Sequence, residues 1–200
     1  MIQTEQVIQE VKKMIKGKDT SICKVFAAML AGGHILIDDV PGVGKTTLAV
    51  AFSQAMQLEN HRVQFTPDVL PADILGFSMY QKETGQFVYY PGAVICNLFL
   101  ADEINRTSPK TQSALLEVME EGCVTVTREM PEPFLVMATQ NPKGSAGTQL
   151  LPESQLDRFM ICVSMGYPDV ATEIEIARGK SASEEQETIS PVIDAAGLCE

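Results

Sequence analysis

The sequence has 200 residues, of which 45% are hydrophobic and 20% are charged, and its formal net charge at pH 7 is −11. This length and hydrophobic content fit one α/β domain, with room for the start of a second. The acidic balance argues against non-specific nucleic-acid binding, because phosphate contacts need Lys and Arg. The sequence has no apolar run long enough to cross a membrane and no signal-peptide pattern at its N-terminus, so we expect a cytoplasmic protein without membrane contacts.

The five cysteines are spread along the sequence, and none forms a closely spaced pair. Their spacing therefore does not indicate a zinc site. Cys23, Cys96 and Cys162 lie within apolar runs. That placement predicts free and buried thiols.

Two helices are expected before the first strand. Apolar side chains recur at helical spacing in residues 4–15, and a second helix begins near Asp19. The apolar stripe of this second helix consists of Ile22, Val25, Phe26, Met29 and Leu30. The apolar run 34–37 then predicts a strand, which is followed by a helix over residues 45–57 and a strand over residues 62–65.

The middle of the sequence is less regular. Residues 71–75 predict a short helical turn, and residues 77–80 and 86–90 flank a Thr-Gly turn and predict a hairpin. Residues 98–101 form a continuous apolar run, which is typical of a central parallel strand covered on both faces.

Clear boundary signals mark the next helix. Ser108 is a good N-cap, Pro109 suits the first helical position, and the helix is expected to run to Glu121 and end at Gly122.

The remaining elements alternate in type. Residues 123–133 predict a small hairpin, residues 134–139 and 160–164 predict strands, and residues 170–179 predict a helix. Residues 181–190 are polar and acidic, as in a linker. Strands that alternate with helices indicate an α/β fold with a central parallel sheet and helices on both faces. Ligands of such folds bind beyond the carboxyl ends of the strands.

The run DVPGVGKTT, residues 39–47, joins a predicted strand to a predicted helix. Its glycines let backbone N–H groups approach phosphates, and the helix N-terminus favours negative charge. Lys45 can reach the β- and γ-phosphates, and the Thr46 hydroxyl can bind Mg²⁺. The usual motif has Gly where this sequence has Asp39, so the match is incomplete at one position. The loop predicts a site for ATP and Mg²⁺ rather than an ordinary Gly-rich turn.

Two carboxylates follow the predicted strand 98–101. Asp102 can hold Mg²⁺ opposite Thr46, and Glu103 can orient or deprotonate the attacking water. An acidic strand end alone would have no such meaning. Together with the phosphate loop, it indicates phosphoryl-transfer chemistry.

Two further candidates lie near the ends of later strands. Asn141 can hold the water and sense the γ-phosphate, although Asn-Pro is also a common turn. Arg158 can reach a neighbouring subunit's γ-phosphate and stabilise charge in the transition state. The alternative for Arg158 is a surface ion pair with Asp157.

These motifs, in this order, resemble the ATPase core of MoxR-family AAA+ proteins. The likeness covers roughly residues 12–178. It is carried by Gly32–Leu36, Val40–Thr46, Gln64–Asp68, Leu70–Gly76, Tyr90–Gly92, Ala101–Arg106, Pro109–Glu117, Ala138–Pro142 and Leu151–Phe159.

The resemblance implies a fold and a domain division. It implies a P-loop NTPase core, a three-layer αβα sandwich with small hairpin insertions, over residues 1–180. Residues 181–200 would be a linker or the start of the family's helical lid. Because the sequence stops at Glu200, we expect a fragment or a truncated product that lacks the lid.

The resemblance also implies roles for individual residues. The nucleotide would be bound by Gly17, near the adenine, and by the Walker A residues Pro41, Gly42, Val43, Gly44, Lys45, Thr46 and Thr47. Thr46 and Asp102 would hold the metal ion. Glu103 would be the catalytic base, Asn141 the first sensor and Arg158 the arginine finger.

Members of this family resemble ring-forming chaperones that mature or activate partner proteins. The resemblance implies a homo-oligomeric ring, a hexamer when the lid is present, often with a von Willebrand A-domain partner and a role in metal insertion. Three alternatives stay open: a nucleotide-dependent scaffold with little turnover because the lid is missing, a nucleic-acid motor and a small-molecule kinase. Glu103 argues against the first, the negative charge against the second, and the lack of an evident acceptor site against the third.

Overall fold

The centre of the fold is a parallel sheet of five strands in the order β2-β5-β8-β1-β9. These strands are β1 (Ile35–Asp38), β2 (Asn60–Gln64), β5 (Leu98–Asp102), β8 (Leu135–Gln140) and β9 (Ile161–Val163). The computed structural model describes residues 2–40, 42–125, 128–141, 151–167, 172, 174 and 188–199.

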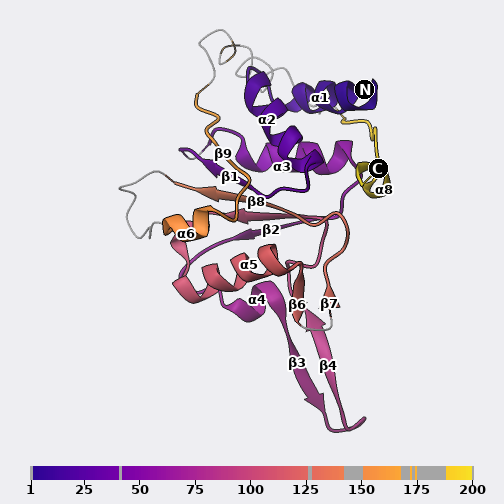
Figure 1. The fold of residues 1–200 in the computed structure, drawn as a ribbon, viewed down its shortest axis with the longest axis vertical. Helices are drawn as coiled ribbons and strands as arrows, with labels where there is room; N and C mark the ends of the chain where they lie inside the picture. The colour runs from indigo at the N-terminus through magenta and orange to yellow at the C-terminus, as the bar shows by residue number, and fades with distance from the viewer. Residues whose placement is uncertain are drawn as a thin grey trace.

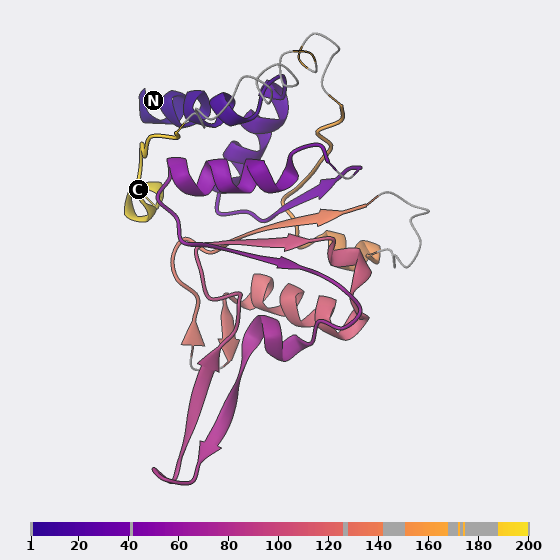
Figure 2. The ribbon, with the colours of Figure 1, turned by 180° about the vertical axis from the view of Figure 1, so that it is seen from behind.

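Helices cover both faces of this sheet (Figures 1 and 2). Helices α1 (Ile2–Met14), α2 (Asp19–Leu30) and α3 (Lys45–Ala55) lie on one face. Helices α4 (Pro71–Leu75) and α5 (Pro109–Glu121) lie on the other. The predicted three-layer αβα arrangement around a parallel sheet is therefore confirmed.

Strand β5 shows how the two cores are divided. Leu98 and Leu100 belong to the hydrophobic core beside α1, α2 and α3, whereas Phe99 and Ala101 belong to the core beside α5. Successive side chains of a strand point to opposite faces. A strand that is apolar at every position before Asp102 consequently needs cover on both sides.

Helix α5 begins and ends where the sequence predicts. The Ser108 hydroxyl accepts a hydrogen bond from the Thr111 backbone N–H at 3.3 Å, and Pro109 takes the first helical position. Gly122 follows the last helical residue with φ of 65°, a conformation that favours glycine. The short 3-10 helix η1 (Ile104–Arg106), which the sequence does not predict, precedes α5 and leads away from the carboxyl end of β5.

The predicted hairpin is present and projects away from the sandwich (Figures 1 and 2). It consists of β3 (Gly76–Gln81) and β4 (Gln86–Pro91), and it pairs Phe77 with Tyr90 and Tyr80 with Phe87 across the strands. Such cross-strand aromatic pairs stabilise a two-stranded sheet. The second small hairpin is formed by β6 (Cys123–Thr125) and β7 (Arg128–Glu129).

The C-terminal segment 188–199 packs on the sandwich and ends in helix α8 (Ala195–Leu198). Ile189 and Leu198 are buried in the core beside α1 and α3, and the Val192 N–H donates to the carbonyl oxygen of Ala55 at 2.8 Å. Most of the expected helix 170–179 and most of the expected linker lie outside the described residues. The division into two domains therefore stays a prediction.

Three expectations about burial are wrong. Cys23 and Cys162 are exposed, although Cys96 is buried as expected. Cys23 lies off the apolar stripe of α2, and β9 is an edge strand with only one neighbour. Leu30, at the end of the stripe, is 46% exposed because α2 ends there. Burial raises the pKa of the Cys96 thiol to about 12, so this thiol stays protonated.

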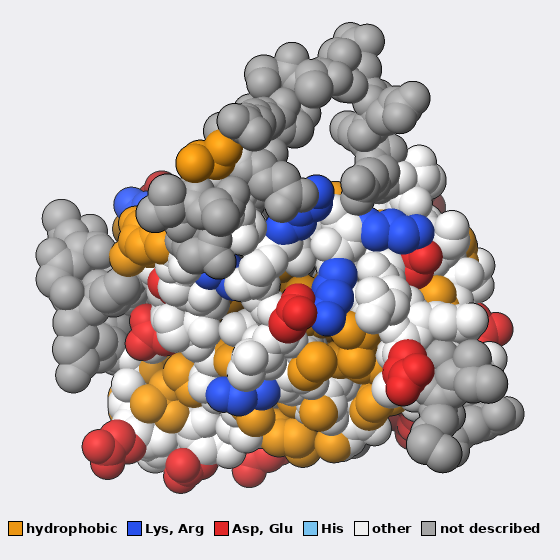
Figure 3. Space-filling view, turned by 90° about the horizontal axis from the view of Figure 1, so that it is seen from above, with side chains coloured by type: hydrophobic (Ala, Val, Ile, Leu, Met, Phe, Trp, Pro, Cys, Tyr) orange, Lys and Arg blue, Asp and Glu red, His pale blue; other side chains and the backbone are white. Residues whose placement is uncertain are grey.

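The surface carries charges of both signs. On the face seen in Figure 3, Lys and Arg side chains are interspersed with acidic and uncharged ones. Within the described ranges, the longest helices are too short or too polar to cross a membrane. The short helix α6 (Glu153–Leu156), which the sequence does not predict, lies near the carboxyl ends of the sheet strands (Figure 1).

Candidate active site

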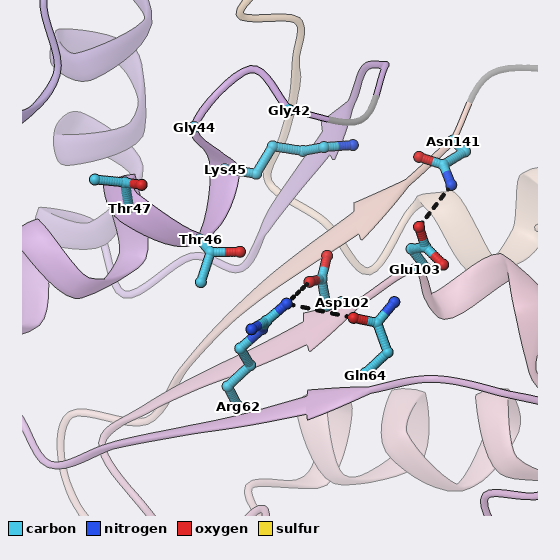
Figure 4. Close-up of a pocket in the computed structure, with 10 residues that line it drawn as sticks. All are labelled: Gly42, Gly44, Lys45, Thr46, Thr47, Arg62, Gln64, Asp102, Glu103 and Asn141. Carbon is cyan, nitrogen blue, oxygen red and sulfur yellow. Dashed lines mark hydrogen bonds and ion pairs between the residues drawn. The ribbon is translucent and has the colours of Figure 1, made fainter. Parts of the chain in front are cut away.

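A pocket of about 370 Å³ lies at the carboxyl ends of the central strands (Figure 4). One side is formed by the loop after β1 and the start of α3, and the other by the ends of β2, β5 and β8. Its lining residues are Gly42, Gly44, Lys45, Thr46, Thr47, Arg62, Gln64, Asp102, Glu103 and Asn141. The structure thus brings together, in one cavity, most of the residues that the sequence predicts for the site.

The loop after β1 depends on glycine. Gly42 and Gly44 have φ of 87° and 91°, which side chains rarely tolerate, and Gly44 is the N-cap of α3. Helix α3 begins at Lys45, so the free N–H groups of its first turn face the pocket end of the helix. This arrangement provides a binding site for phosphate groups.

Lys45 is held by backbone oxygens. Its ammonium donates to the carbonyl oxygen of Asp39 at 2.6 Å and to that of Gln140 at 3.3 Å, and the residue is 7% exposed. Burial lowers the pKa of Lys45, and the nearby carboxylates, of which Asp102 acts most strongly, offset only part of this effect. Among the described residues no carboxylate forms an ion pair with this ammonium, so its charge is available to an anion in the pocket.

Asp102 receives a partner on each oxygen. The Thr139 hydroxyl donates to its Oδ1 at 2.6 Å, and Arg62 donates from Nη2 to its Oδ2 at 2.6 Å. Thr139 also accepts from the Glu103 N–H at 2.9 Å, which connects the ends of β5 and β8. In Figure 4 the Thr46 hydroxyl faces the Asp102 carboxylate across the pocket.

Glu103 and Asn141 are in direct contact at the ends of β5 and β8. The Asn141 amide donates from Nδ2 to Glu103 Oε1 at 2.9 Å, and Arg106 donates to Oε2 at 2.7 Å. Burial alone would raise the pKa of Glu103, but the bonds from Arg106 and Asn141 outweigh it and the pKa lies below its ordinary value. Glu103 also has φ of 58°, and a strained backbone at a non-glycine residue is common at functional sites.

The oxygen of the Asn141 side chain is the unexplained polar atom of the pocket. It is buried and has no hydrogen-bond partner in the described part of the protein. Buried polar atoms are nearly always satisfied, so this oxygen indicates a water molecule or a ligand group at the site. Asn105, which is fully buried, fixes the backbone of Asn141 by bonds of 3.2 and 3.4 Å.

The other predicted residues lie outside the pocket or outside the described residues. Arg158 forms an ion pair with Glu120 of α5 at 2.7 Å rather than with Asp157, and its Nη1 donates to the carbonyl oxygen of Ser154 at 2.7 Å. Gly17 lies between α1 and α2 with φ of 71°, and Val43 packs at the edge of the α1–α3 core. Pro41 is not among the described residues.

Asp39 explains the departure from the usual phosphate-loop motif. Its Oδ2 accepts from Ser164 Oγ, Met165 N and Gly166 N at 3.1, 2.6 and 2.5 Å. Burial alone would raise the pKa of Asp39. These three bonds and one from the Val40 N–H outweigh the effect of burial, so the pKa lies below its ordinary value. The carboxylate therefore ties the start of the phosphate loop to the segment that leaves β9.

Sequence reasoning missed several side chains of the site, namely Arg62, Gln64, Asn105, Arg106 and Thr139. For the first two, the alternation of a strand places Arg62 and Gln64 on one face of β2, but the register that brings them to Asp102 is seen only in the structure. The others were not predictable without the turn of η1 and the register between β5 and β8.

The donor set suits a magnesium ion. The described residues contain no group of three or more His, Cys, Asp or Glu side chains arranged to hold a metal. Mg²⁺ is instead commonly bound by one or two carboxylates together with substrate phosphates and water. A hydroxyl and a carboxylate that face each other, Thr46 and Asp102, fit that mode.

Comparison with known proteins identifies the family of this chain. A family model described as "ATPase family associated with various cellular activities (AAA)" matches residues 34–161. The chain is 48% identical over 191 residues to the uncharacterized protein YeaC of Bacillus subtilis, covering 94% of this chain and 60% of that protein. It is 45% identical over 175 residues to chaperone MoxR1 of Mycobacterium tuberculosis, covering 86% of this chain and 46% of that protein.

A solved structure agrees with these sequence matches. The crystal structure of a protein from Cytophaga hutchinsonii, described as a candidate ATPase, superimposes with a TM-score of 0.86 at 39% identity and covers 99% of this chain and 61% of that one. The chain thus spans between about half and three fifths of the length of these relatives. Because the family model and the MoxR relatives match the greater part of the chain, this protein belongs to the MoxR family of AAA+ ATPases.

Proposed function

We propose that this chain is the ATP-binding and ATP-hydrolysing core of a MoxR-type chaperone that remodels or activates partner proteins. One observation carries the proposal: the phosphate loop, two carboxylates and a buried amide oxygen without a partner converge on a single pocket. The loop suits the phosphates of ATP, and the opposite side suits a metal ion and a water molecule.

The geometry of the pocket supports the proposed binding roles. The N–H groups at the start of α3 and the Lys45 ammonium bind the phosphates, since the partners of Lys45 in the described part of the chain are carbonyl oxygens. Thr46 and Asp102 hold Mg²⁺, which neutralises phosphate charge when bound. Gly42, Val43 and Gly44 shape the loop, together with Pro41, and Thr47 binds the nucleotide from the first turn of α3. Gly17 is proposed to lie near the adenine.

The hydrolytic roles fall to Glu103 and Asn141. With its pKa lowered, Glu103 is ionised at neutral pH and can accept a proton from an attacking water. Its Oε1 already accepts from Asn141, whose free Oδ1 can bind the same water or a γ-phosphate group. Glu103 is thus the base and Asn141 the positioning group.

The assembly is proposed by analogy with the family. Arg158 lies outside its own pocket, on the surface beside α5, where a neighbouring subunit's nucleotide could reach it in a ring. A hexamer, a von Willebrand A-domain partner and a role in metal insertion belong to this proposal. So does the division into a core over residues 1–180 and a linker or lid segment over residues 181–200.

A second function, a nucleotide-dependent scaffold with little turnover, is favoured by one observation. Both carboxylates of the site are neutralised by arginines, Asp102 by Arg62 and Glu103 by Arg106. A site that rests in this paired state could bind nucleotide without completing hydrolysis.

A single-turnover assay separates these functions. The chain, in excess over radiolabelled ATP, is mixed with and without Mg²⁺, and phosphate release and bound nucleotide are both measured. Mg²⁺-dependent release supports the ATPase, whereas binding without release supports the scaffold. Absence of binding would contradict both.

A further inference from the structure

Arg62 is bound to Asp102, the residue that we propose as a metal ligand. Arg62 and Gln64 share one face of β2, and the register between the strands places Gln64 opposite Asp102. The Arg62 Nη2 atom is 2.6 Å from Asp102 Oδ2 and 3.3 Å from Gln64 Oε1 (Figure 4). The guanidinium is therefore fixed by two acceptors inside the pocket.

The two oxygens of Asp102 have different roles. Oδ1 accepts from the Thr139 hydroxyl at 2.6 Å, an interaction between neighbouring strands that belongs to the framework of the sheet. Oδ2 accepts from Arg62, whose side chain is 49% exposed and can withdraw into solvent. A metal ion between Thr46 and Asp102 would consequently compete with Arg62 for Oδ2.

Ion pairs weaken the attraction of the pocket carboxylates for a free metal ion. Asp102 is paired with Arg62 and Glu103 with Arg106. Each pairing offsets the negative charge of a carboxylate that lines the pocket. A divalent cation that arrives without phosphates therefore meets carboxylates whose charge is already balanced.

We propose that Arg62 is a tethered cation that competes with divalent metal for Asp102. The nucleotide-free protein then binds metal weakly, and metal enters together with the phosphates, whose negative charge reverses the balance and releases the guanidinium. The inference rests on the proposed function, because it takes Asp102 as a metal ligand. It adds an order of binding that the proposed function does not contain.

The test measures Mn²⁺ binding to the nucleotide-free chain, with free Mn²⁺ followed by electron paramagnetic resonance. Arg62→Gln and Arg62→Met remove the charge, and Met keeps an aliphatic stem of similar length. Both should lower the Mn²⁺ dissociation constant about fivefold, as expected for release of a half-exposed ion pair. Arg62→Lys should keep the weak binding of the wild type. Lys82→Gln, at an exposed residue of the β3–β4 hairpin, controls for the loss of one positive charge.

Asp102→Asn, combined with Arg62→Gln, identifies the ligand. The gain in Mn²⁺ affinity should disappear in this double variant. An unchanged dissociation constant in both neutral Arg62 variants would overturn the inference, and so would a gain that survives Asp102→Asn. Binding of a fluorescent ATP analogue to the wild type is measured in parallel. Failure of the analogue to bind would contradict the proposed function, whereas the Mn²⁺ dissociation constants would still test whether Arg62 competes with the metal.

Discussion

The two sides of the pocket are built in different ways. On the phosphate-loop side, Lys45 contacts backbone carbonyl oxygens and the donors are backbone N–H groups at the start of α3. On the strand-end side, carboxylates contact other side chains, Asp102 with Arg62 and Glu103 with Arg106 and Asn141. One side is organised by the backbone and the other by ion pairs.

This difference assigns phosphate binding to the loop side and hydrolysis to the strand-end side. A backbone cradle keeps its geometry whether or not a nucleotide is present, so the loop side is preorganised for phosphate. Ion pairs between side chains can be exchanged for a metal, a water or a phosphate, so the strand side can change partners. Substitutions on the loop side should alter affinity, and substitutions on the strand side should alter turnover.

The largest expected effect concerns Arg158. We propose that this arginine completes the nucleotide site of a neighbouring subunit, as a third side of that pocket. Arginines supplied in trans contribute about 10³- to 10⁵-fold to the rate in other phosphoryl-transfer enzymes. Arg158→Ala should therefore lower ATPase activity by about 10³-fold or more in a longer protein that includes the lid, with nucleotide affinity nearly unchanged.

Mixed rings test the origin of that arginine. When Arg158→Ala subunits are mixed with Lys45→Ala subunits, some interfaces combine an intact Lys45 with an intact Arg158. ATPase activity should then exceed that of either variant alone. If rings shown to be mixed recover no activity, Arg158 does not act on a neighbour's nucleotide.

Glu103→Gln tests the strand-end side. The amide keeps a hydrogen-bonding oxygen but cannot take a proton, so turnover should fall by about 10²- to 10⁴-fold while nucleotide affinity is retained. Phosphate release and fluorescent-nucleotide titration measure the two quantities. Glu117→Gln, at an exposed position of α5, is the matched control. Turnover at the wild-type rate in Glu103→Gln would exclude Glu103 as the base.

Lys45→Ala tests the loop side. Hydrogen bonds to charged groups contribute about 1.5 to 3 kcal/mol, so nucleotide affinity should fall by about 10- to 100-fold. Lys110→Ala removes an equal charge from an exposed position of α5 and should leave affinity unchanged. An equal loss in both variants would mean that Lys45 acts only through the overall charge of the protein.

Most of the fold was predictable because its signals are local. The apolar run of β5 and the caps of α5 specify a buried strand and a helix with defined ends, and both predictions are confirmed. Other features depend on contacts between distant parts of the chain. The burial of Cys162 depends on which strand lies at the edge of the sheet, and the packing of α8 depends on contacts with α1 and α3.

The residues of the site likewise divide into those that local sequence signals identify and those that depend on contacts between distant elements. The motif residues Lys45, Thr46, Asp102, Glu103 and Asn141 follow strands in sequence, so a parallel sheet brings them together and the sequence suffices to find them. The pairing of Arg62 with Asp102 is different, because it depends on the register between β2 and β5. Nothing in the local sequence around either residue specifies that register.

The smallest effect is expected at Asp39, which supports the loop side from outside the pocket. Its carboxylate accepts three hydrogen bonds from residues 164–166, and Asn would place an amide N–H₂ group against backbone N–H donors. We expect Asp39→Asn to lower the free energy of unfolding by about 1 to 2 kcal/mol, measured by urea denaturation at pH 7. Asp68→Asn, at an exposed turn residue, should change it little.

The pH dependence of this effect gives a sharper test. Because the pKa of Asp39 lies below its ordinary value of 3.8 in the folded protein, its contribution to stability is complete above that value. The contribution is lost as the pH falls from there toward the lowered pKa, where the folded protein also takes up the proton. The difference in unfolding free energy between wild type and Asp39→Asn should therefore be constant from pH 7 to about pH 5 and shrink below pH 4. A difference that stays constant below pH 4 would mean that the Asn side chain destabilises the loop by its shape, and that the charge of Asp39 contributes nothing.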